Sequence, residues 1–288
     1  MARTERPVAV VTGASRGAGR GIAIALGSHG CTVIVTGRTE HGGDSPLGGT
    51  IHETADAITE AGGNGVARRV DHANDDEVKD LFDGIERDHG RLDILVNNAC
   101  SIHDEMMSPG TFWEKPLEVG VDMLDVGLRS GYVATYYAAP LLIAQGRGLV
   151  VFTSGSGAVH YIFGPGYGAH KTGMDRFASD MAVDFRQHGV AVLSIWMGGL
   201  HTERMERLIS SDPERYRSLA ETLETPEFSG HIIWVLYDDP ALMELSGRTV
   251  IGAEMAVKYG IKDRGGRQPP SYRDTLGVEP VHYMGRFS

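Results

Sequence analysis

Short apolar runs rich in β-branched residues alternate with segments of helical periodicity along most of the chain. Seven runs recur, at residues 8–11, 31–35, 66–70, 94–96, 149–152, 190–196 and 249–251. Continuous apolar runs of this length are typical of strands buried on both faces, as in a parallel sheet. Strand–helix–strand repetition implies right-handed crossovers. We therefore predict an α/β protein with a doubly wound parallel sheet of about seven strands, a Rossmann fold in three α/β/α layers.

The segments between the runs have the pattern of amphipathic helices. Asn74 is a suitable N-cap, and the apolar residues after it share one helix face: Val78, Leu81, Phe82 and Ile85. No change of composition marks a linker, and a chain of 288 residues can bury the core of one large domain. We predict a single dinucleotide-binding domain over residues 1–288.

Three segments interrupt the alternation. Residues 40–50 are polar and rich in glycine, which is typical of a flexible connection. Residues 199–229 contain helix-like pieces after the sixth strand. We interpret them as a lid, because ligands of such sheets bind beyond the carboxyl ends of the strands; a surface helical insertion is the alternative. The tail over residues 263–288 is irregular and has no predicted role.

Charge and cysteine content exclude several classes of function. A formal net charge of -11 argues against a nucleic-acid surface, which needs a basic stripe. Cys31 and Cys100 form no CxxC pair, and no metal-ligand spacing accompanies them, so we expect reduced thiols and no metal. The first residues lack an apolar signal core, and no run of about 18 apolar residues is available to span a bilayer. We expect a cytoplasmic protein without nucleic-acid or membrane partners.

A glycine-rich turn follows the first predicted strand. It reads TGASRGAG over residues 12–19, and the helical pattern resumes near its second glycine. At such a junction, backbone N–H groups and the positive helix end can bind a pyrophosphate where glycine leaves room. The spacing alone is weak evidence, but its place at the first strand–helix junction strengthens it. The predicted cofactor-binding residues of the turn are Gly13, Ser15, Arg16, Gly17 and Gly19.

The end of the second predicted strand indicates which nicotinamide dinucleotide binds. It carries Arg38 and no carboxylate, whereas an acidic residue there favours NAD. A guanidinium can pair with the 2′-phosphate of NADP, and Arg16 can approach from the turn; a solvated surface charge is the alternative for each. We predict NADP(H). Asp71, after the third strand, is an adenine neighbour or an ordinary turn aspartate, with equal weight.

Three residues in the second half of the chain form a candidate catalytic set. Tyr167 and Lys171 are four apart, so they share one face of a helix, and an adjacent ammonium favours the phenolate by lowering the tyrosine pKa from about 10. Ser154 ends the fifth strand, where its hydroxyl can hold a carbonyl oxygen. A YxxxK pair or a strand-end serine is by itself mostly chance. Only the combination is informative.

These motifs together make the chain resemble the short-chain dehydrogenases/reductases over about residues 7–260. The match comprises the glycine turn, the tripeptide NNA at residues 97–99, the serine and the YxxxK pair. The resemblance implies that Tyr167 is the general acid/base, that Ser154 orients the carbonyl, and that Lys171 binds ribose and adjusts the phenol pKa. Besides Tyr167 and Lys171, the cofactor-binding residues that it implies are Asn97, Ala99 and Thr202. Thr202 matches a position that often contacts the nicotinamide amide.

Two positions depart from the pattern of the family. Gly127 stands where many members have an asparagine that contributes to a proton relay through water, and Met197 stands where many have a proline. Segments 112–114, 126–129 and 245–248 resemble one member that shares this glycine and is associated with NADPH-dependent reduction of carbonyl compounds. That member has an apolar C-terminal extension, which is not found here, so membrane attachment is not carried over.

The sequence thus predicts an NADP-dependent oxidoreductase that acts on a carbonyl or secondary alcohol. Residues that can line an apolar pocket, or simply pack, are Tyr161, Phe163, Trp196, Met197 and Met205. Reduction is favoured over alcohol oxidation. A catalytically weak, NADP-binding sensor is the alternative from another class. By analogy with the family, we expect a homodimer or homotetramer.

Overall fold

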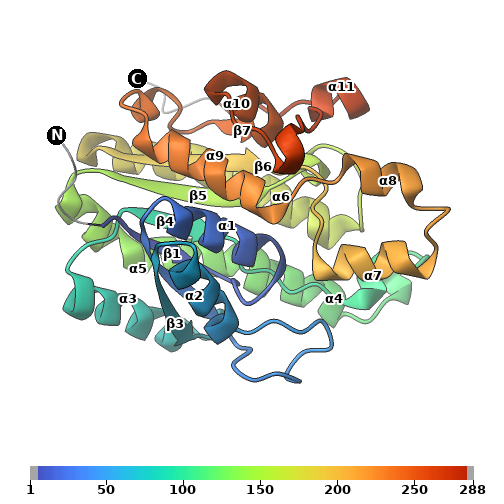
Figure 1. Cartoon of the computed structure of the whole chain (residues 1–288), viewed down its shortest axis with the longest axis horizontal. Helices are drawn as coiled ribbons and strands as arrows, with labels where there is room; N and C mark the ends of the chain where they lie inside the picture. Colours follow the sequence, from blue (N-terminus) through green and yellow to red (C-terminus); the bar gives the residue numbers. More distant parts are fainter. Residues whose placement is uncertain (1–5, 284–288) are drawn as a thin grey trace.

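Seven parallel strands form one sheet in the computed structural model, which describes residues 6–283. The strands are β1 (Val8–Val11), β2 (Thr32–Gly37), β3 (Asn64–Arg69), β4 (Ile94–Asn97), β5 (Gly148–Ser154), β6 (Val190–Trp196) and β7 (Thr249–Ile251). Their order is β3-β2-β1-β4-β5-β6-β7, so the winding reverses between β1 and β4 (Figure 1). This reversal creates the crevice in which ligands of doubly wound sheets bind. The predicted fold class is confirmed.

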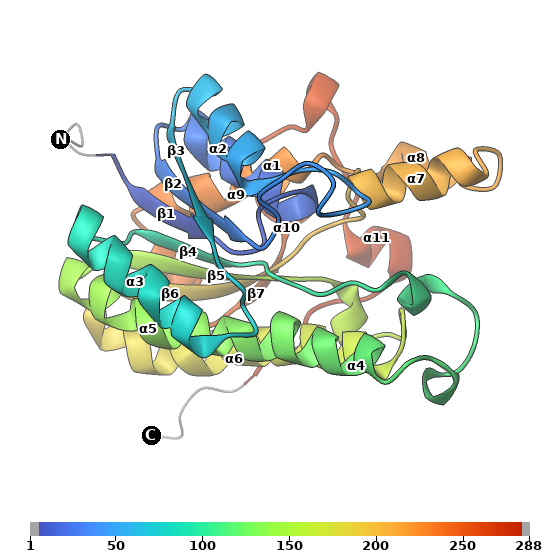
Figure 2. The ribbon, with the colours of Figure 1, turned by 90° about the horizontal axis from the view of Figure 1, so that it is seen from below.

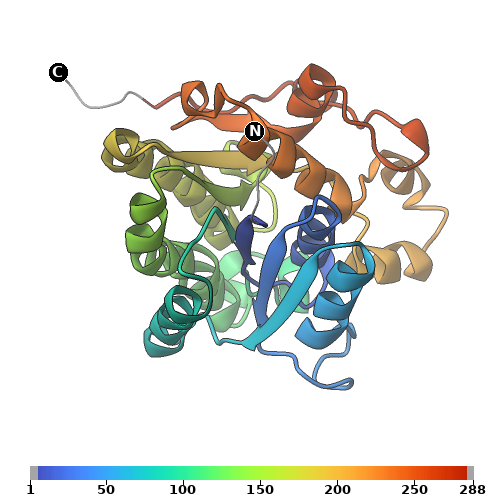
Figure 3. The ribbon, with the colours of Figure 1, turned by 60° about the vertical axis from the view of Figure 1, so that its left-hand side comes forward.

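Strand β3 begins two residues before the apolar run that predicted it. Its residues are exposed or half-buried, unlike those of the other strands, because it lies at the edge of the sheet. Asn64 nevertheless pairs with Thr32 of β2, and Arg69 pairs with Gly37. Hydrogen bonding rather than burial therefore sets the bounds of β3, which a hydrophobic pattern cannot detect. Figure 3 shows that the sheet is twisted, so β3 runs in a different direction from β5 and β6.

Helices cover both faces of the sheet (Figure 2). One layer contains α1 (Gly17–Ser28), α2 (Ile51–Glu60) and α9 (Pro226–Asp238), and the other contains α3 (Asp75–His89), α5 (Ser130–Gln145) and α6 (Pro165–Phe185). Each layer packs its own apolar cluster against the strands. Asn74 caps α3 as predicted, since its Oδ1 accepts from the Asp76 N–H at 3.1 Å. The predicted helix face, Val78 to Ile85, is buried.

Shorter helical segments connect these elements, and several of them lie beyond the end of the sheet where the strands terminate. The α-helices are α4 (Glu118–Asp122), α7 (Glu203–Ser211), α8 (Arg217–Thr222), α10 (Gly252–Tyr259) and α11 (Tyr272–Leu276). A π-helix, η3 (Met123–Arg129), joins α4 to α5, and the 3-10 turns are η1 (Asp104–Met107), η2 (Phe112–Glu114), η4 (Ser156–Ala158), η5 (Arg186–His188), η6 (Leu242–Glu244) and η7 (Arg264–Gly266). Figure 2 shows α4, α7, α8 and α11 beyond one end of the sheet.

The helical insertion predicted over residues 199–229 comprises α7 and α8. It ends at Thr225, because Pro226 starts α9, a helix of the main layer. The tail is not wholly irregular: it contains η7 and α11, while its last residues, 284–288, lie outside the described part of the chain. Within residues 6–283, no helix has both the length and the apolar character needed to cross a bilayer.

Candidate active site

The glycine turn packs directly against the residues that follow β4. Gly13 and Gly17 have φ values of +64° and +57°, which side-chain-bearing residues rarely adopt. A Cβ added to Gly13 would lie 2.7 Å from the Ala99 Cα, and one added to Gly19 would lie 2.4 Å from the Gly13 carbonyl oxygen. Glycine is therefore needed here for backbone-to-backbone contact. Ser15 is buried and faces Gly37 at the end of β2.

Thr12 and Asn98 hold this contact together, and neither was among the predicted site residues. The Thr12 hydroxyl accepts hydrogen bonds from the backbone N–H groups of Asn98 and Ala99, both at 2.9 Å. The Asn98 amide donates to the Thr12 carbonyl at 2.9 Å. Neighbouring Asn97 is buried and donates to Thr135 at 2.9 Å, while its Oδ1 has no partner among the described residues. The tripeptide thus both fixes the turn and presents an unsatisfied oxygen beside it.

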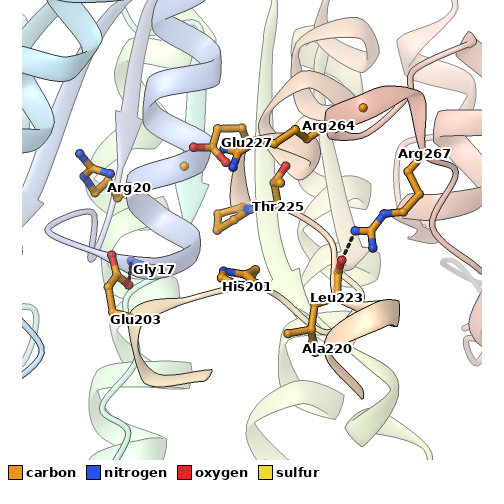
Figure 4. Close-up of a pocket in the computed structure, with 13 residues that line it drawn as sticks. Gly17, Arg20, His201, Glu203, Ala220, Leu223, Thr225, Glu227, Arg264 and Arg267 are labelled. Atoms are coloured by element: carbon orange, nitrogen blue, oxygen red, sulfur yellow. Dashed lines mark hydrogen bonds between the residues drawn. The ribbon is translucent and has the colours of Figure 1, made fainter. Parts of the chain in front are cut away.

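The N-terminus of α1 binds a carboxylate from α7. The Gly17 N–H donates to Glu203 Oε2 at 2.9 Å (Figure 4). Arg16, at the N-cap, makes no side-chain capping bond. Free N–H groups and the helix dipole make such a terminus a binding site for anions. The carboxylate stands where a phosphate oxygen would be bound, so the donor set fits a pyrophosphate. Thr202 caps α7 beside this point, with its Cγ2 3.6 Å from a Cβ built on Gly17.

The two arginines predicted to recognise a phosphate have different surroundings. Arg16 donates to the Gly48 carbonyl at 2.7 Å and to Thr39 Oγ1 at 2.8 Å, so it anchors the loop over residues 40–50. Arg38 is 62% exposed, and its ion pair among residues 6–283 is a 3.8 Å contact with Asp71. The guanidinium of Arg38 is therefore available to a ligand at the end of β2. Asp71 also accepts from the Ala73 N–H at 3.0 Å, so it stabilises a turn as well.

Ser154, Tyr167 and Lys171 converge as predicted. The Ser154 hydroxyl donates to the Lys171 carbonyl at 3.1 Å, and the Lys171 ammonium lies 5.5 Å from the centre of the Tyr167 ring. A Cβ built on Gly155 would lie 4.0 Å from the Tyr167 hydroxyl, and one on Gly157 would lie 2.4 Å from the ring. The end of β5 and the start of α6 therefore bring a hydroxyl, a phenol and an ammonium into one site.

Burial dominates the electrostatics of this set. It raises the pKa of Tyr167 above its ordinary value of 10, with smaller contributions from Cys100 and Tyr272. Burial also lowers the pKa of Lys171, whose ammonium donates to the Thr153 carbonyl at 2.9 Å. The expected lowering of the tyrosine pKa by lysine is not found in this arrangement, because the Lys171 ammonium donates to the Thr153 carbonyl and burial sets the direction of the shift.

His170 fills the space beside Gly127. A Cβ on Gly127 would lie 2.9 Å from the imidazole Nε2, so an asparagine cannot occupy position 127 without displacing the ring. His170 is fully buried, and its Nδ1 lies 3.1 Å from the Met123 sulfur. Burial lowers the His170 pKa well below 6.5, so the ring is neutral at physiological pH. Gly127 lies within π-helix η3, a geometry often found at functional sites. The sequence indicated the glycine but not its histidine partner.

The loop after β6 is held from beneath by a buried glutamate. The Gly198 N–H donates to Glu224 Oε1 at 2.9 Å, and the Glu224 N–H donates to the Gly199 carbonyl at 2.8 Å. Burial raises the pKa of Glu224 to about 7, and the neighbouring charge of Asp263 acts in the same direction. Glu224 was not predicted, because nothing in its local pattern distinguishes it from a surface glutamate.

The residues predicted to line an apolar pocket separate into two groups. Trp196 is fully buried and donates to Asp175 at 2.9 Å, so it belongs to the core and cannot contact a ligand. Phe163 is 40% exposed and packs edge-on against Tyr167, with 5.3 Å between ring centres, and Tyr161 is exposed next to it. The apolar surface near the phenol therefore comes from the segment between η4 and α6.

A cavity of about 480 Å³ opens on the other side of the glycine turn, between α1, α8, α9 and η7 (Figure 4). Its lining is mixed and includes the charged or polar residues Arg20, His201, Glu203, Glu227, Arg264 and Arg267. None of the catalytic candidates lines it. Its lining includes Gly17 and Glu203, which are joined by a hydrogen bond.

Comparisons with known proteins agree with this geometry. A family model described as short chain dehydrogenase matches residues 7–213. The mouse (Mus musculus) protein Dehydrogenase/reductase SDR family member 1 is 37% identical over 275 residues, which cover 92% of this chain and 85% of the mouse protein. A solved structure from Xanthomonas campestris, described as a dehydrogenase, has a TM-score of 0.76 at 25% identity and covers 92% of this chain and 93% of its own. A metagenomic short-chain oxidoreductase in complex with NADP has a TM-score of 0.67 at 26% identity, covering 85% and 95%.

Proposed function

This chain belongs to the short-chain dehydrogenase family, whose members are oxidoreductases acting on CH–OH and C=O groups with a nicotinamide cofactor, and we propose that it is an NADPH-dependent carbonyl reductase. The observation that carries the proposal is the convergence of Ser154, Tyr167 and Lys171 beside the glycine turn. Its substrate is a small apolar ketone or aldehyde, or the corresponding secondary alcohol in the reverse direction.

The residues around the turn fit a dinucleotide with a 2′-phosphate. The N-terminus of α1 already binds one carboxylate, which supports a pyrophosphate site there. Arg38 is exposed at the end of β2 and matches the planar geometry of a phosphate. Asp71 lies beside it as an adenine neighbour, and a related structure is described in complex with NADP. NADPH, when bound, supplies the hydride.

The protonation state of the candidate acid favours reduction. An ordinary tyrosine is protonated at neutral pH, and burial shifts the pKa of Tyr167 further in that direction, so the phenol can donate its proton to a carbonyl oxygen that is gaining negative charge. Ser154 directly precedes Gly155, which lies beside the Tyr167 hydroxyl. The Ser154 hydroxyl can therefore hold the same carbonyl oxygen. The Thr153 carbonyl positions the Lys171 ammonium. From there the ammonium can bind a ribose hydroxyl and help to return a proton to Tyr167 after the phenol has donated its own.

The surface of α5 supports self-association. Tyr132 and Tyr136 are 51% and 65% exposed, and Leu117, just before α4, is 77% exposed. Large apolar residues gathered along one helical surface are typical of an interface between subunits. We therefore include a homodimer or homotetramer formed through this surface in the proposal. Light scattering that finds only monomer at micromolar concentration would exclude it.

The activity is tested by the loss of NADPH absorbance with a panel of ketones and aldehydes. Tyr167→Phe should lower kcat by a factor of roughly 100 to 10,000 while NADPH still binds, because only the proton donor is lost. The matched control is Tyr259→Phe, which removes a hydroxyl that donates to Asp239, away from the candidate site, and should leave kcat unchanged.

Two results would overturn the proposal. Turnover that survives in Tyr167→Phe would show that the phenol is not the acid. Tight NADPH binding without turnover of any carbonyl or alcohol, and without an effect of Tyr167→Phe, would favour an NADP-binding sensor instead. Equal kcat/KM values with NADH and NADPH would leave a reductase but remove the predicted cofactor preference.

A further inference from the structure

The C-terminal segment, residues 263–276, is fastened to the elements that surround the candidate site. Asp263 accepts from the Thr225 N–H at 3.1 Å at the start of α9, and Arg267 pairs with Asp263 at 2.9 Å. Arg267 also donates to the Leu223 carbonyl (Figure 4). Ser271 caps α11 and donates to Glu254 at 2.7 Å. These contacts fix the position from which α11 begins.

The first residue of α11 reaches the loop that follows β6. The Tyr272 hydroxyl donates to the Met197 carbonyl at 2.9 Å, and its ring stands edge-on to Trp196, 6.3 Å between centres. The ring is mostly buried, and Ser156 of η4 forms a hydrogen bond to its hydroxyl that opposes the effect of burial on its pKa. Tyr272 is also close enough to Tyr167 that its charged form would raise the pKa of that phenol. A residue 75 positions after Met197 thus lies at the candidate active site.

The loop after β6 contains two consecutive glycines. Residues 197–199 read Met-Gly-Gly, with no proline to restrict φ, and glycines lose much conformational freedom when they are ordered. Backbone hydrogen bonds join the loop to Ser154 and Glu224, and two side chains add to this restraint. Tyr272 binds the Met197 carbonyl from one side, and Glu224 binds the Gly198 N–H at 2.9 Å from the other. The same loop leads directly into Thr202 and the carboxylate at the N-terminus of α1.

We propose that Tyr272 is a positioning residue for hydride transfer: it holds the loop over residues 197–202 in the conformation that binds the nicotinamide half of the cofactor. This inference rests on the proposed function for the identity of the cofactor. It assigns a role to the C-terminal segment, for which the sequence predicted none. The adenosine half is bound at the opposite side of the site, by the turn and Arg38, so Tyr272 should not influence it.

Binding measurements on the full chain can separate the two halves of the cofactor without any turnover. Tyr272→Phe removes one hydroxyl and keeps the ring against Trp196. We expect its Kd for NADPH to rise about fivefold, as for the loss of one hydrogen bond, while its Kd for adenosine 2′,5′-bisphosphate, which lacks the nicotinamide half, stays within twofold. Tyr259→Phe, the matched control, should change neither value. In steady-state assays KM for NADPH should rise in Tyr272→Phe, and kcat should fall.

Several outcomes would overturn the inference. Unchanged binding of both ligands would show that the hydroxyl does not position the loop, and equal weakening of both would indicate general destabilisation. If the wild-type protein had the same Kd for NADPH as for adenosine 2′,5′-bisphosphate, the loop would contribute nothing to binding of the nicotinamide half. A differential effect in a protein that reduces no carbonyl would leave the role of Tyr272 intact and overturn only the proposed reductase activity.

Discussion

The two walls of the candidate active site are built in different ways. The glycine wall, residues 12–19 and 97–99, is closed by backbone against backbone, with no room for a Cβ on Gly13 or Gly19. The loop wall, residues 197–211 and 263–276, is held by single side chains such as Tyr272. Close-packed backbone leaves no alternative arrangement, whereas hydrogen bonds from side chains can be removed one at a time. The difference teaches that the glycine wall tolerates no side chain at Gly13 or Gly19 and that the loop wall can be adjusted gradually.

The strongest way to break this comparison is to add one methyl group to the glycine wall. Gly19→Ala places a Cβ 2.4 Å from the Gly13 carbonyl oxygen. We therefore expect the free energy of unfolding to fall by about 3 kcal/mol and NADPH binding to be lost as well. Urea denaturation measures the first effect. The control is Gly42→Ala, which meets no atom within 4 Å and should change stability by less than about 0.5 kcal/mol. Equal stabilities of the two variants would contradict a rigid glycine wall.

The second test asks whether the loop wall depends on pH. The pKa of Glu224 is raised from 4.5 to about 7, chiefly by burial and also by the charge of Asp263, and is lowered by Arg267. The neutral carboxyl is therefore favoured in the folded state, and its contribution to stability is complete below pH 4.5 and is lost as pH rises through 7. Each pKa unit corresponds to about 1.36 kcal/mol, so the free energy of unfolding should fall by about 3 kcal/mol as Glu224 ionises.

Glu224→Gln should remove this dependence. We expect the variant to gain about 1–3 kcal/mol relative to wild type between pH 5 and pH 8, because the wild-type carboxylate becomes charged in a buried position and the amide does not. Thermal denaturation at the two pH values gives the comparison. Parallel pH profiles of wild type and variant would show that Glu224 does not titrate in this range.

A side chain at the rim of the glycine wall should control which cofactor binds. Arg38 is exposed and is not needed for packing, so Arg38→Ala should leave stability unchanged. We expect its Kd for NADPH to rise about tenfold, as one charge-assisted contact with the 2′-phosphate is lost, and its Kd for NADH to stay constant. Fluorescence titration with both dinucleotides provides the measurement. A parallel change in both would place Arg38 away from the 2′-phosphate.

The smallest expected effect concerns the contact between the two walls. Glu203 belongs to the loop wall but binds the N–H of Gly17 in the glycine wall, where its negative charge competes with phosphate. Glu203→Gln removes the charge and keeps the length of the side chain. We expect NADPH to bind about two- to fivefold more tightly, with a smaller gain at high salt. Weaker binding would show that the carboxylate supports the cofactor site.

Much of the fold and of the glycine wall was predictable from the sequence. Buried parallel strands appear in the sequence as continuous apolar runs. The glycine turn and the NNA tripeptide are short motifs that mark the ends of β1 and β4, and all residues of each motif are close together in the sequence. Ser154, Tyr167 and Lys171 were found in the same way and do converge. Strand β3 begins two residues and ends one residue before the predicted run, since its residues are exposed or half-buried and its bounds follow from pairing with β2.

The sequence by itself determined the α/β architecture, the turn and the three catalytic candidates, since each follows from local periodicity or a short motif. Only the tertiary structure decided that His170 occupies the space left by Gly127, that burial raises the pKa of Tyr167, and that Tyr272 reaches Met197 from the tail. The physical reason is that packing, desolvation and long-range hydrogen bonds depend on residues that are distant in the chain, and no local pattern records which of them will meet.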